Sequence, residues 1–123
     1  MEYMLMFYEA PDDFAARNDT DEKKSGAYWG AWMAYSKAIT EAGVSKGVGS
    51  ALQPPASSTT VRLNGGTRHV QDGPFADSKE QLGGFMIIET PSLDEALEWA
   101  ARCPAAARGA VEVRPVLDMG CGD

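Results

Sequence analysis

The segment from 72 to 84 holds the residues of this chain that are best placed to do chemistry. It begins with Asp72-Gly73-Pro74-Phe75, continues through Lys79 and Glu80, and ends at Gly83-Gly84. A carboxylate just ahead of a glycine–proline turn is held in a defined position, where it could accept a proton or bind a cationic or hydroxyl-bearing ligand. The Asp72 carboxylate could equally cap its own turn by accepting a bond from a backbone N–H two residues on. The sequence leaves both roles open.

Charged and aromatic residues elsewhere are candidates to complete a site around Asp72. Glu112 and Arg114 alternate with apolar residues in one predicted strand, so they share a face and could pair across a cavity or form an edge salt bridge. Lys79 and Glu80 are either part of the site or a solvated charge pair. Aromatic residues would supply apolar walls, although at these spacings aromatics more often belong to a core. With Asp72 as the candidate catalytic base, the predicted ligand-binding residues are Tyr8, Trp32, Phe75, Lys79, Glu80 and Arg114.

Metal and cofactor chemistry is not predicted. The chain has one histidine, His69, and two cysteines, Cys103 and Cys121, which cannot form a closed zinc site within one protomer. Three residues separate His69 from Asp72, which puts their side chains on opposite faces of a strand and argues against a dyad. We expect both thiols to be reduced and structurally incidental.

Composition indicates one soluble domain. The chain has 123 residues, 44% of them hydrophobic and 24% charged, and a formal net charge of −7 that disfavours contact with nucleic-acid phosphates. No apolar run approaches the roughly 20 residues that span a bilayer, and the apolar opening has no basic start. We predict a cytoplasmic protein with one domain over 1–118 and a flexible, glycine-containing tail over 119–123.

Apolar periodicity predicts alternating strands and helices. Residues 3–8 are apolar on both alternating faces, which is typical of a strand that is covered on both sides. Thr20 is the expected cap of the first helix, and Ser92 with Glu95 forms a capping box for the second, which Pro104 ends. We predict helices at 20–42 and from Ser92 to Pro104, a loop at 9–19, and strands at 3–8, 44–52, 59–64, 67–71, 85–88 and 111–117. A stripe of small residues four apart, which would let the first helix approach a neighbour closely, is formed by Gly26, Gly30, Ala34 and Ala38.

This order predicts a ferredoxin-like α+β sandwich with an inserted β-hairpin, joined through Gly65-Gly66, before the third core strand. Both helices would lie on one face of the sheet. Because the strand at 3–8 is apolar on both sides, a second copy is expected to cover the other face, so we predict a homodimer.

Several segments resemble one known family. They are Gln53-Pro54-Pro55, Asp72-Gly73-Pro74-Phe75, Lys79-Glu80-Gln81-Leu82-Gly83-Gly84, Ala96-Leu97-Glu98-Trp99-Ala100-Ala101 and Val113-Arg114-Pro115. In this order they are similar to the pattern of the YCII-related family, in particular its DGPF branch, which comprises small bacterial proteins of mostly unassigned activity. The resemblance implies a dimeric α+β barrel, in which two ferredoxin-like sheets pack face to face.

The chain departs from that family where its chemistry is suspected. Many members pair a histidine on the first helix with an aspartate just before the proline that follows the second. Here the first helix offers Tyr28, Trp29 or Trp32 in that region, and Cys103 precedes Pro104. An aromatic residue cannot shuttle a proton near neutral pH, so a histidine base held by an aspartate is not expected.

Two functions remain open at this point. The first is binding of a small polar organic molecule in a pocket beside the Asp-Gly-Pro-Phe turn, with proton transfer by Asp72 and an anionic group held by Arg114. The second is a non-catalytic binding or regulatory module. It is linked to sigma-factor-dependent transcription initiation, because some DGPF-branch proteins are associated with sigma factors.

Overall fold

The computed structural model describes residues 1–120, so Cys121 and the end of the predicted tail lie outside the described residues. In chain order the elements are β1 (Glu2–Glu9), α1 (Pro11–Ala16), α2 (Glu22–Glu41), β2 (Ser45–Ala51), the 3-10 helix η1 (Pro55–Ser57), β3 (Thr59–Asn64), β4 (Thr67–Asp72), β5 (Gln81–Glu89), α3 (Leu93–Arg102), α4 (Pro104–Arg108) and β6 (Ala110–Pro115). None of the helices described is both long enough and apolar enough to span a bilayer.

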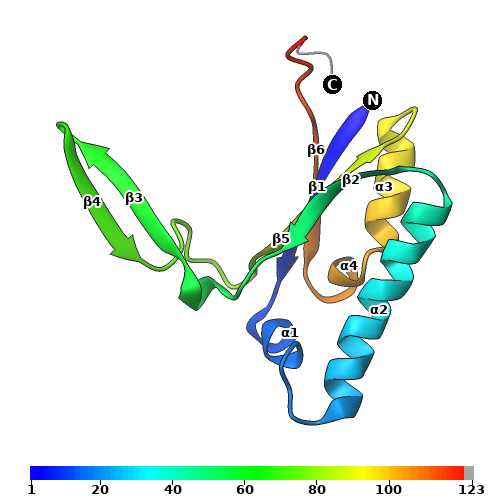
Figure 1. Ribbon diagram of the computed structural model, residues 1–123, viewed down its shortest axis with the longest axis horizontal. Helices are drawn as coiled ribbons and strands as arrows, with labels where there is room; N and C mark the ends of the chain where they lie inside the picture. The colour runs from blue at the N-terminus through cyan, green and yellow to red at the C-terminus, as the bar shows by residue number, and fades with distance from the viewer. Residues whose placement is uncertain (121–123) are drawn as a thin grey trace.

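Four strands form an antiparallel sheet in the order β2-β5-β1-β6. With α2 between β1 and β2 and α3 between β5 and β6, this is the ferredoxin-like arrangement. Helices α2, α3 and α4 lie on one side of the sheet, and within residues 1–120 no helix covers the other side (Figure 1). The predicted α+β class and ferredoxin-like topology with an inserted hairpin are therefore confirmed.

The central strand β1 divides its side chains between a core and an open face, because successive residues of a strand point to opposite sides. Tyr3, Leu5 and Phe7 are buried in one cluster with residues of α2 and α3. The opposite face of the sheet has no helix over it, and there the side chains of β1 are only half-buried. They are Met4, Met6 and Tyr8.

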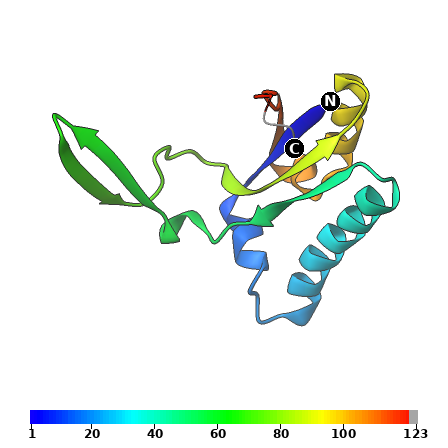
Figure 2. The same ribbon diagram turned by 45° about the horizontal axis from the view of Figure 1, so that its top comes forward.

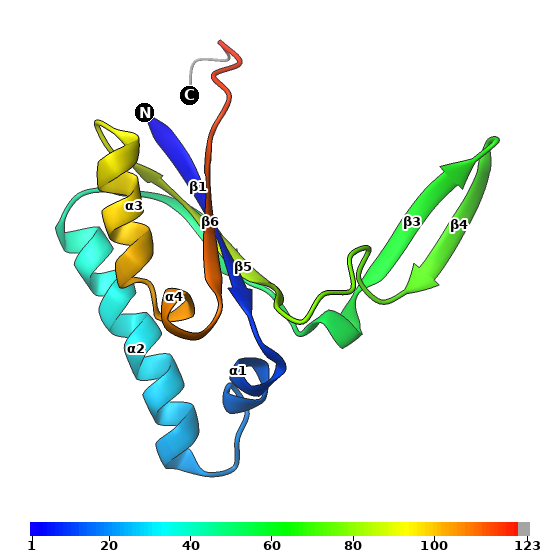
Figure 3. The same ribbon diagram turned by 180° about the vertical axis from the view of Figure 1, so that it is seen from behind.

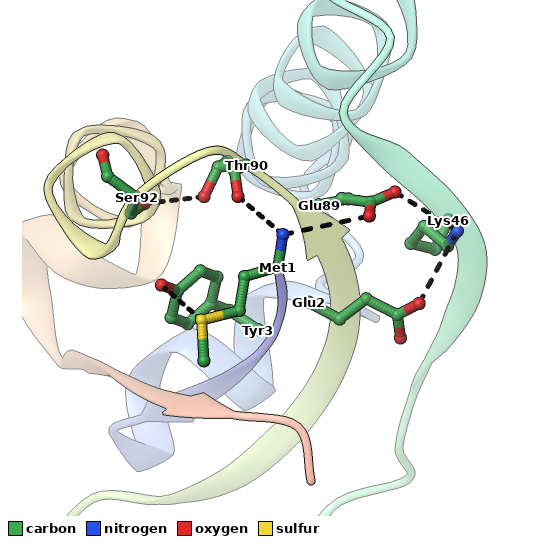
Figure 4. A network of polar contacts seen from close by, with 7 residues as sticks. All are labelled: Met1, Glu2, Tyr3, Lys46, Glu89, Thr90 and Ser92. Atoms are coloured by element: carbon green, nitrogen blue, oxygen red, sulfur yellow. Dashed lines mark hydrogen bonds and ion pairs between the residues drawn. The ribbon is translucent and has the colours of Figure 1, made fainter. Parts of the chain in front are cut away.

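The start of β1 is tied to β2 and β5 by polar contacts (Figure 4). The Met1 ammonium group donates to the carbonyl oxygen of Thr90 at 3.0 Å and lies 3.9 Å from the Glu89 carboxylate. Lys46 bridges Glu89 and Glu2 at 3.4 and 3.6 Å, and the nearby Glu89 charge raises the pKa of Lys46. These contacts align three strand ends at one edge of the domain.

Strands β3 and β4 form a separate two-stranded sheet that projects away from the helices (Figures 1, 2 and 3). Their turn is Gly65-Gly66, with φ of 59° and 83°, the left-handed conformation that a two-residue hairpin turn requires. The predicted hairpin is confirmed, with Val61 opposite Val70 in its register.

Two predicted boundaries are wrong. Residues 11–16 form the short helix α1 where a loop was expected, with Pro11 in its first turn. The cap of α2 is Asp21, whose side chain accepts from the Lys23 N–H at 3.0 Å, and not Thr20. The helix α2 begins at Glu22, one residue later than its apolar pattern predicted, so Asp21 is the residue that precedes its first turn.

The second predicted helix, α3, begins and ends as expected, but a second short helix, α4, follows it directly instead of a loop. Ser92 Oγ accepts from the Glu95 N–H at 3.3 Å, which confirms half of the capping box. Pro104 does follow the last turn of α3, and it also opens α4. A proline lacks the N–H that the first turn of a helix leaves unpaired, so it can end one helix and begin the next.

Candidate functional site

Asp72 stands at the base of the projecting hairpin. It ends β4 opposite Thr59, and its side chain is exposed. The turn after it is held by Gly73, whose N–H donates to the Ser58 carbonyl at 2.8 Å and whose carbonyl accepts from the Thr60 hydroxyl at 2.8 Å. Within residues 1–120 no hydrogen bond reaches the Asp72 carboxylate, so the turn is formed without it.

A cavity of about 470 Å³, here called the turn cavity, lies between this turn and the start of β5. Tyr8, Pro74 and Phe75 are among its walls, so the structure brings two of the predicted aromatic residues together. The Phe75 side chain is 73% exposed, and the Arg62 guanidinium lies 4.7 Å from its ring centroid. The other five predicted residues are absent from the described lining: Trp32, Asp72, Lys79, Glu80 and Arg114.

Gln81, a lining residue of the turn cavity, carries a buried oxygen without a partner in the described part of the chain. Its Nε2 donates to the Ser78 carbonyl at 2.9 Å and faces Asp77 Oδ1 at 3.4 Å. These two acceptors fix the orientation of the amide, since swapping the amide atoms would set oxygen against oxygen. The Gln81 Oε1 atom is buried and has no donor within the described residues. Gln81 was quoted in the family pattern but was not predicted as a site residue.

Tyr8 links the turn cavity to the charged pair on β6. Its hydroxyl donates to Glu112 Oε1 at 3.3 Å, and Arg114 donates to Glu112 Oε2 at 2.5 Å. Burial, with the neighbouring Glu112 charge, raises the pKa of Tyr8. Glu112 and Arg114 therefore pair directly on the open face of the sheet. Of the two predicted alternatives, this arrangement corresponds to the edge salt bridge.

Trp32 lies on the other side of the sheet. Its ring packs on Phe7 with the centroids 4.9 Å apart, and Phe7 points toward the helices whereas Tyr8 points away from them. Trp32 is not a lining residue of the turn cavity. It lines two other cavities, of about 620 and 400 Å³, together with Glu9 and Tyr28.

The structure also contains a buried charged network that the sequence did not reveal, here called the Arg17 network. Arg17 donates to Glu9 Oε1 at 3.1 Å and to the Tyr28 hydroxyl at 3.1 Å, and Tyr28 donates to Glu9 Oε2 at 2.8 Å. Arg17 also binds the backbone carbonyls of Leu52 and Gly83. The charged side chains are 8% and 4% exposed, and burial raises the pKa of Tyr28 to about 12. One signal could have found it, since Glu9 continues the buried face of β1.

Each glycine of the pair Gly83-Gly84 lies against a close neighbour, Gly83 against this network and Gly84 against the adjacent strand. A Cβ atom at Gly83 would lie 2.7 Å from Glu9 Oε1 and 3.0 Å from an Arg17 nitrogen. A Cβ atom at Gly84 would lie 2.9 Å from the Ser50 carbonyl of the adjacent strand. Both positions need glycine for space, so this part of the pattern serves packing.

Two places that the family resemblance singles out lie near each other. Trp32 and Pro104 line the same cavity of about 620 Å³, whereas Cys103 is not among the residues that line it. Cys103 is itself buried, and burial raises the pKa of its thiol to about 11, so it is neutral near pH 7. An uncharged thiol cannot orient a base as a carboxylate does.

No group of three or more candidate metal ligands occurs among residues 1–120. His69 faces Arg62 across the hairpin, and it is three residues from Asp72, on the opposite face of β4. No histidine–aspartate dyad is formed there.

Comparison with known proteins gives the family and the fold. The chain is 46% identical over 67 residues to an uncharacterized protein of Rhizobium meliloti (strain 1021), and this match spans 53% of the chain and 54% of that protein, about half of its length. A solved structure of 5-chloro-2-hydroxyhydroquinone dehydrochlorinase from Burkholderia phenoliruptrix AC1100, in complex with 2,5-dihydroxybenzoquinone, superposes with a TM-score of 0.55. That alignment covers 100% of both chains at 19% sequence identity, a likeness of fold.

A family model described as the YCII-related domain matches residues 1–120, nearly the whole chain. The match agrees with the segments quoted above and with the ferredoxin-like topology. On this basis the chain belongs to the YCII-related domain family.

Proposed function

We propose that the protein binds a small polar organic molecule, bearing at least one hydroxyl or amine donor, in the turn cavity beside the Asp-Gly-Pro-Phe turn. The observation that carries this proposal is the buried Gln81 Oε1 atom without a donor. A buried acceptor left unpaired costs about 1–3 kcal/mol. A turn of the Gln81 side chain toward the cavity would let a donor on a bound molecule bond this oxygen and offset that cost. Tyr8 and Phe75 supply flat apolar walls, and a volume of about 470 Å³ suits a molecule of this kind.

The test is a titration with small hydroxylated molecules, 2,5-dihydroxybenzoquinone among them, followed by protein NMR. Gln81→Met removes the acceptor at similar size and should weaken binding about tenfold, the effect of one hydrogen bond. Gln71→Met makes the same change on the exposed hairpin, outside the cavity, and should leave affinity unchanged. Equal affinity of Gln81→Met and the unsubstituted protein would remove the basis of the proposal.

Catalysis by Asp72 is a second candidate. Its position two residues before Pro74, a wall of the turn cavity, favours this role, as does the absence of any bond that would occupy its carboxylate in the turn. Asp72→Asn should change stability by less than about 1 kcal/mol while weakening binding or turnover. If Asp72→Asn binds the same molecule as tightly as the unsubstituted protein, Asp72 is not the base. The non-catalytic module linked to a sigma factor would then be favoured.

We further propose that the protein is a homodimer in which a second copy covers the open face of the sheet. Support comes from the apolar side chains of β1 and β5 on that face, where no helix lies within residues 1–120. Their partial burial would become complete against a second sheet about 10 Å away. Light scattering at micromolar concentration should give the mass of two chains.

A further inference from the structure

The hairpin of β3 and β4, residues 59–72 and here called the arm, has no packing partner for one of its faces. Its strands pair with each other and not with the four-stranded sheet. The arm extends from the base of β2 and β5 to the side away from α2 (Figures 1 and 3). Isolated two-stranded hairpins are at best marginally stable in water, so the arm needs a surface to pack on.

The two faces of the arm differ in character. Val61 and Val70 face each other across the strands, and Leu63 lies two residues along on the same side. These three side chains are 56%, 53% and 74% exposed, respectively. The other side carries Arg62 and His69, a directly opposed pair. Arg68, opposite Leu63 in the register, lies on the same side as the two valines. One face is thus mainly apolar and unburied, with Arg68 beside its apolar residues, and the other is polar.

Charge indicates what kind of surface the arm would meet. Residues 59–72 contain two arginines and His69 against one carboxylate, Asp72. Setting these aside from the 11 basic and 18 acidic residues leaves nine basic residues against 17 acidic residues in the rest of the chain. The arm is therefore a basic segment of an acidic protein, and a second copy of this chain offers it the opposite charge.

Helix α2 presents an exposed surface on which such a face can pack. Met33 is 70% and Trp29 39% accessible there, and Lys23 and Lys37 are exposed beside them. A Cβ atom at Gly26 or Gly30 would meet nothing within 4 Å, so a neighbour can approach closely there. On one flank of α2, the cavity of about 620 Å³ is lined by Asp12 and Asp19 and also by Lys24 and Arg108.

We propose that the arm of one protomer crosses to a second copy and packs its apolar face on the exposed side of that copy's α2. The inference rests on the proposed homodimer. Strands of six residues reach about 20 Å, which covers the roughly 10 Å to a facing sheet and the roughly 10 Å of a helix layer beyond it. If both arms cross in this way, each protomer covers the exposed side of α2 of the other and buries the apolar face of its own arm.

The first measurement is dimer dissociation on dilution, by analytical ultracentrifugation. Leu63→Asp places a charge on the apolar face and should raise the dissociation constant by about tenfold or more, as expected for loss of a buried leucine contact. Asn64→Asp makes the same charge at the next residue, on the opposite face, and should change it by less than about twofold. Circular dichroism of both variants checks that the four-stranded body is folded.

The second measurement is a cross-link that does not depend on affinity. In a Cys121→Ser background, Leu63→Cys combined with Met33→Cys on the exposed side of α2 should form a disulfide between two chains, because the arm points away from its own α2 (Figures 1 and 3). Leu63→Cys combined with Glu98→Cys on the exposed side of α3 should not. Amide hydrogen exchange in residues 59–72 should slow as protein concentration rises.

The possible outcomes separate the two proposals. A monomeric unsubstituted protein at micromolar concentration overturns the homodimer, and the arm exchange with it. The arm proposal alone is overturned by a stable dimer in which the amide hydrogens of the arm exchange as fast as those of an unprotected chain and the dissociation constant is unchanged by Leu63→Asp. Cross-linking through position 98 and not through position 33 would contradict the choice of α2.

Discussion

Arg17 connects more of this structure than any other side chain described here. It is bound by one carboxylate, one phenol and two backbone carbonyls, which come from four different parts of the chain. A guanidinium supplies five donors in a rigid plane, so a single residue can satisfy several acceptors at once. In this position it joins α1 and the start of α2 to the lower end of the sheet.

Removing Arg17 should therefore be costly. Arg17→Met leaves the Glu9 carboxylate buried without its counter-charge and should lower the free energy of unfolding by about 3–5 kcal/mol. The double variant Glu9→Gln, Arg17→Met should recover part of that loss, because no unpaired charge remains. Urea denaturation of the three proteins measures both effects. Arg114→Met breaks the exposed pair with Glu112 and should cost less than about 1 kcal/mol, which makes it the control.

Tyr28 gives the Arg17 network a signature at alkaline pH. Burial raises its pKa to about 12 in the folded protein, while in the unfolded chain it is near 10. Below pH 10 both states are protonated and the stabilisation is fully present. Between pH 10 and 12 the unfolded chain ionises first, so the free energy of unfolding should fall. Tyr28→Phe should show a shallower fall over this range, and identical slopes would contradict the assignment.

At the scale of elements, glycines decide where strands can come together. Gly83 lies in β5 against the Arg17 network, at the point where the register with β1 shifts between Phe7 and Tyr8. Gly26 lies on the exposed side of α2, where nothing is close. The same residue type therefore has opposite effects on stability in the two elements.

This contrast can be tested with two identical substitutions. Gly83→Ala forces its methyl group against Glu9 and Arg17 and should destabilise the protein by about 1–3 kcal/mol. Gly26→Ala should stabilise it by about 0.5–1 kcal/mol, since alanine costs less backbone entropy in a helix. Thermal unfolding of both variants is the measurement. A harmless Gly83→Ala would show that the network relaxes and that space is not the reason for glycine there.

Local signals explain which elements the sequence predicted well. Strict alternation and Gly65-Gly66 located the hairpin, because both signals are read within about 14 residues. The short helix α1 was missed because six residues carry too little periodicity, although Pro11 marked its start. The Asp72 segment predicted a site with Tyr8 and Phe75 in its walls; both line the turn cavity, whereas Asp72 itself does not.

Side-chain contacts between distant segments were beyond such signals. Glu9, Arg17 and Tyr28 are ordinary residues at unremarkable spacings, and only folding shows that they share one buried site. Trp32 was assigned to the predicted site from its residue type, but the sheet separates it from the turn cavity. The unpaired oxygen of Gln81 depends on how one loop of residues 77–80 closes, which no pattern encodes.

For the whole molecule, the open face of the sheet is the feature that most needs a covering partner. Met6 lies at its centre, in β1, between Phe85 of β5 and Glu112 of β6. If a second copy covers this face, Met6→Asp should raise the dimer dissociation constant by about 100-fold or more, the effect of losing a central interface contact. Leu97→Asp, on the exposed side of α3, should leave it unchanged. Light scattering over a dilution series distinguishes the two.

The position of β1 in the sheet also sets the order in which the chain can fold during synthesis. β1 is made first, yet its two neighbours are β5 and β6, the last strands of the sequence. About 70 residues separate the end of β1 from the start of β5, so at roughly 5–20 residues per second the strand waits several seconds for its first partner. The two strands of the hairpin need no distant segment to pair with each other, and they can do so within microseconds of emerging. The arm therefore emerges with both of its strands available for pairing, while the most apolar strand of the protein is still unpaired and open to chaperones.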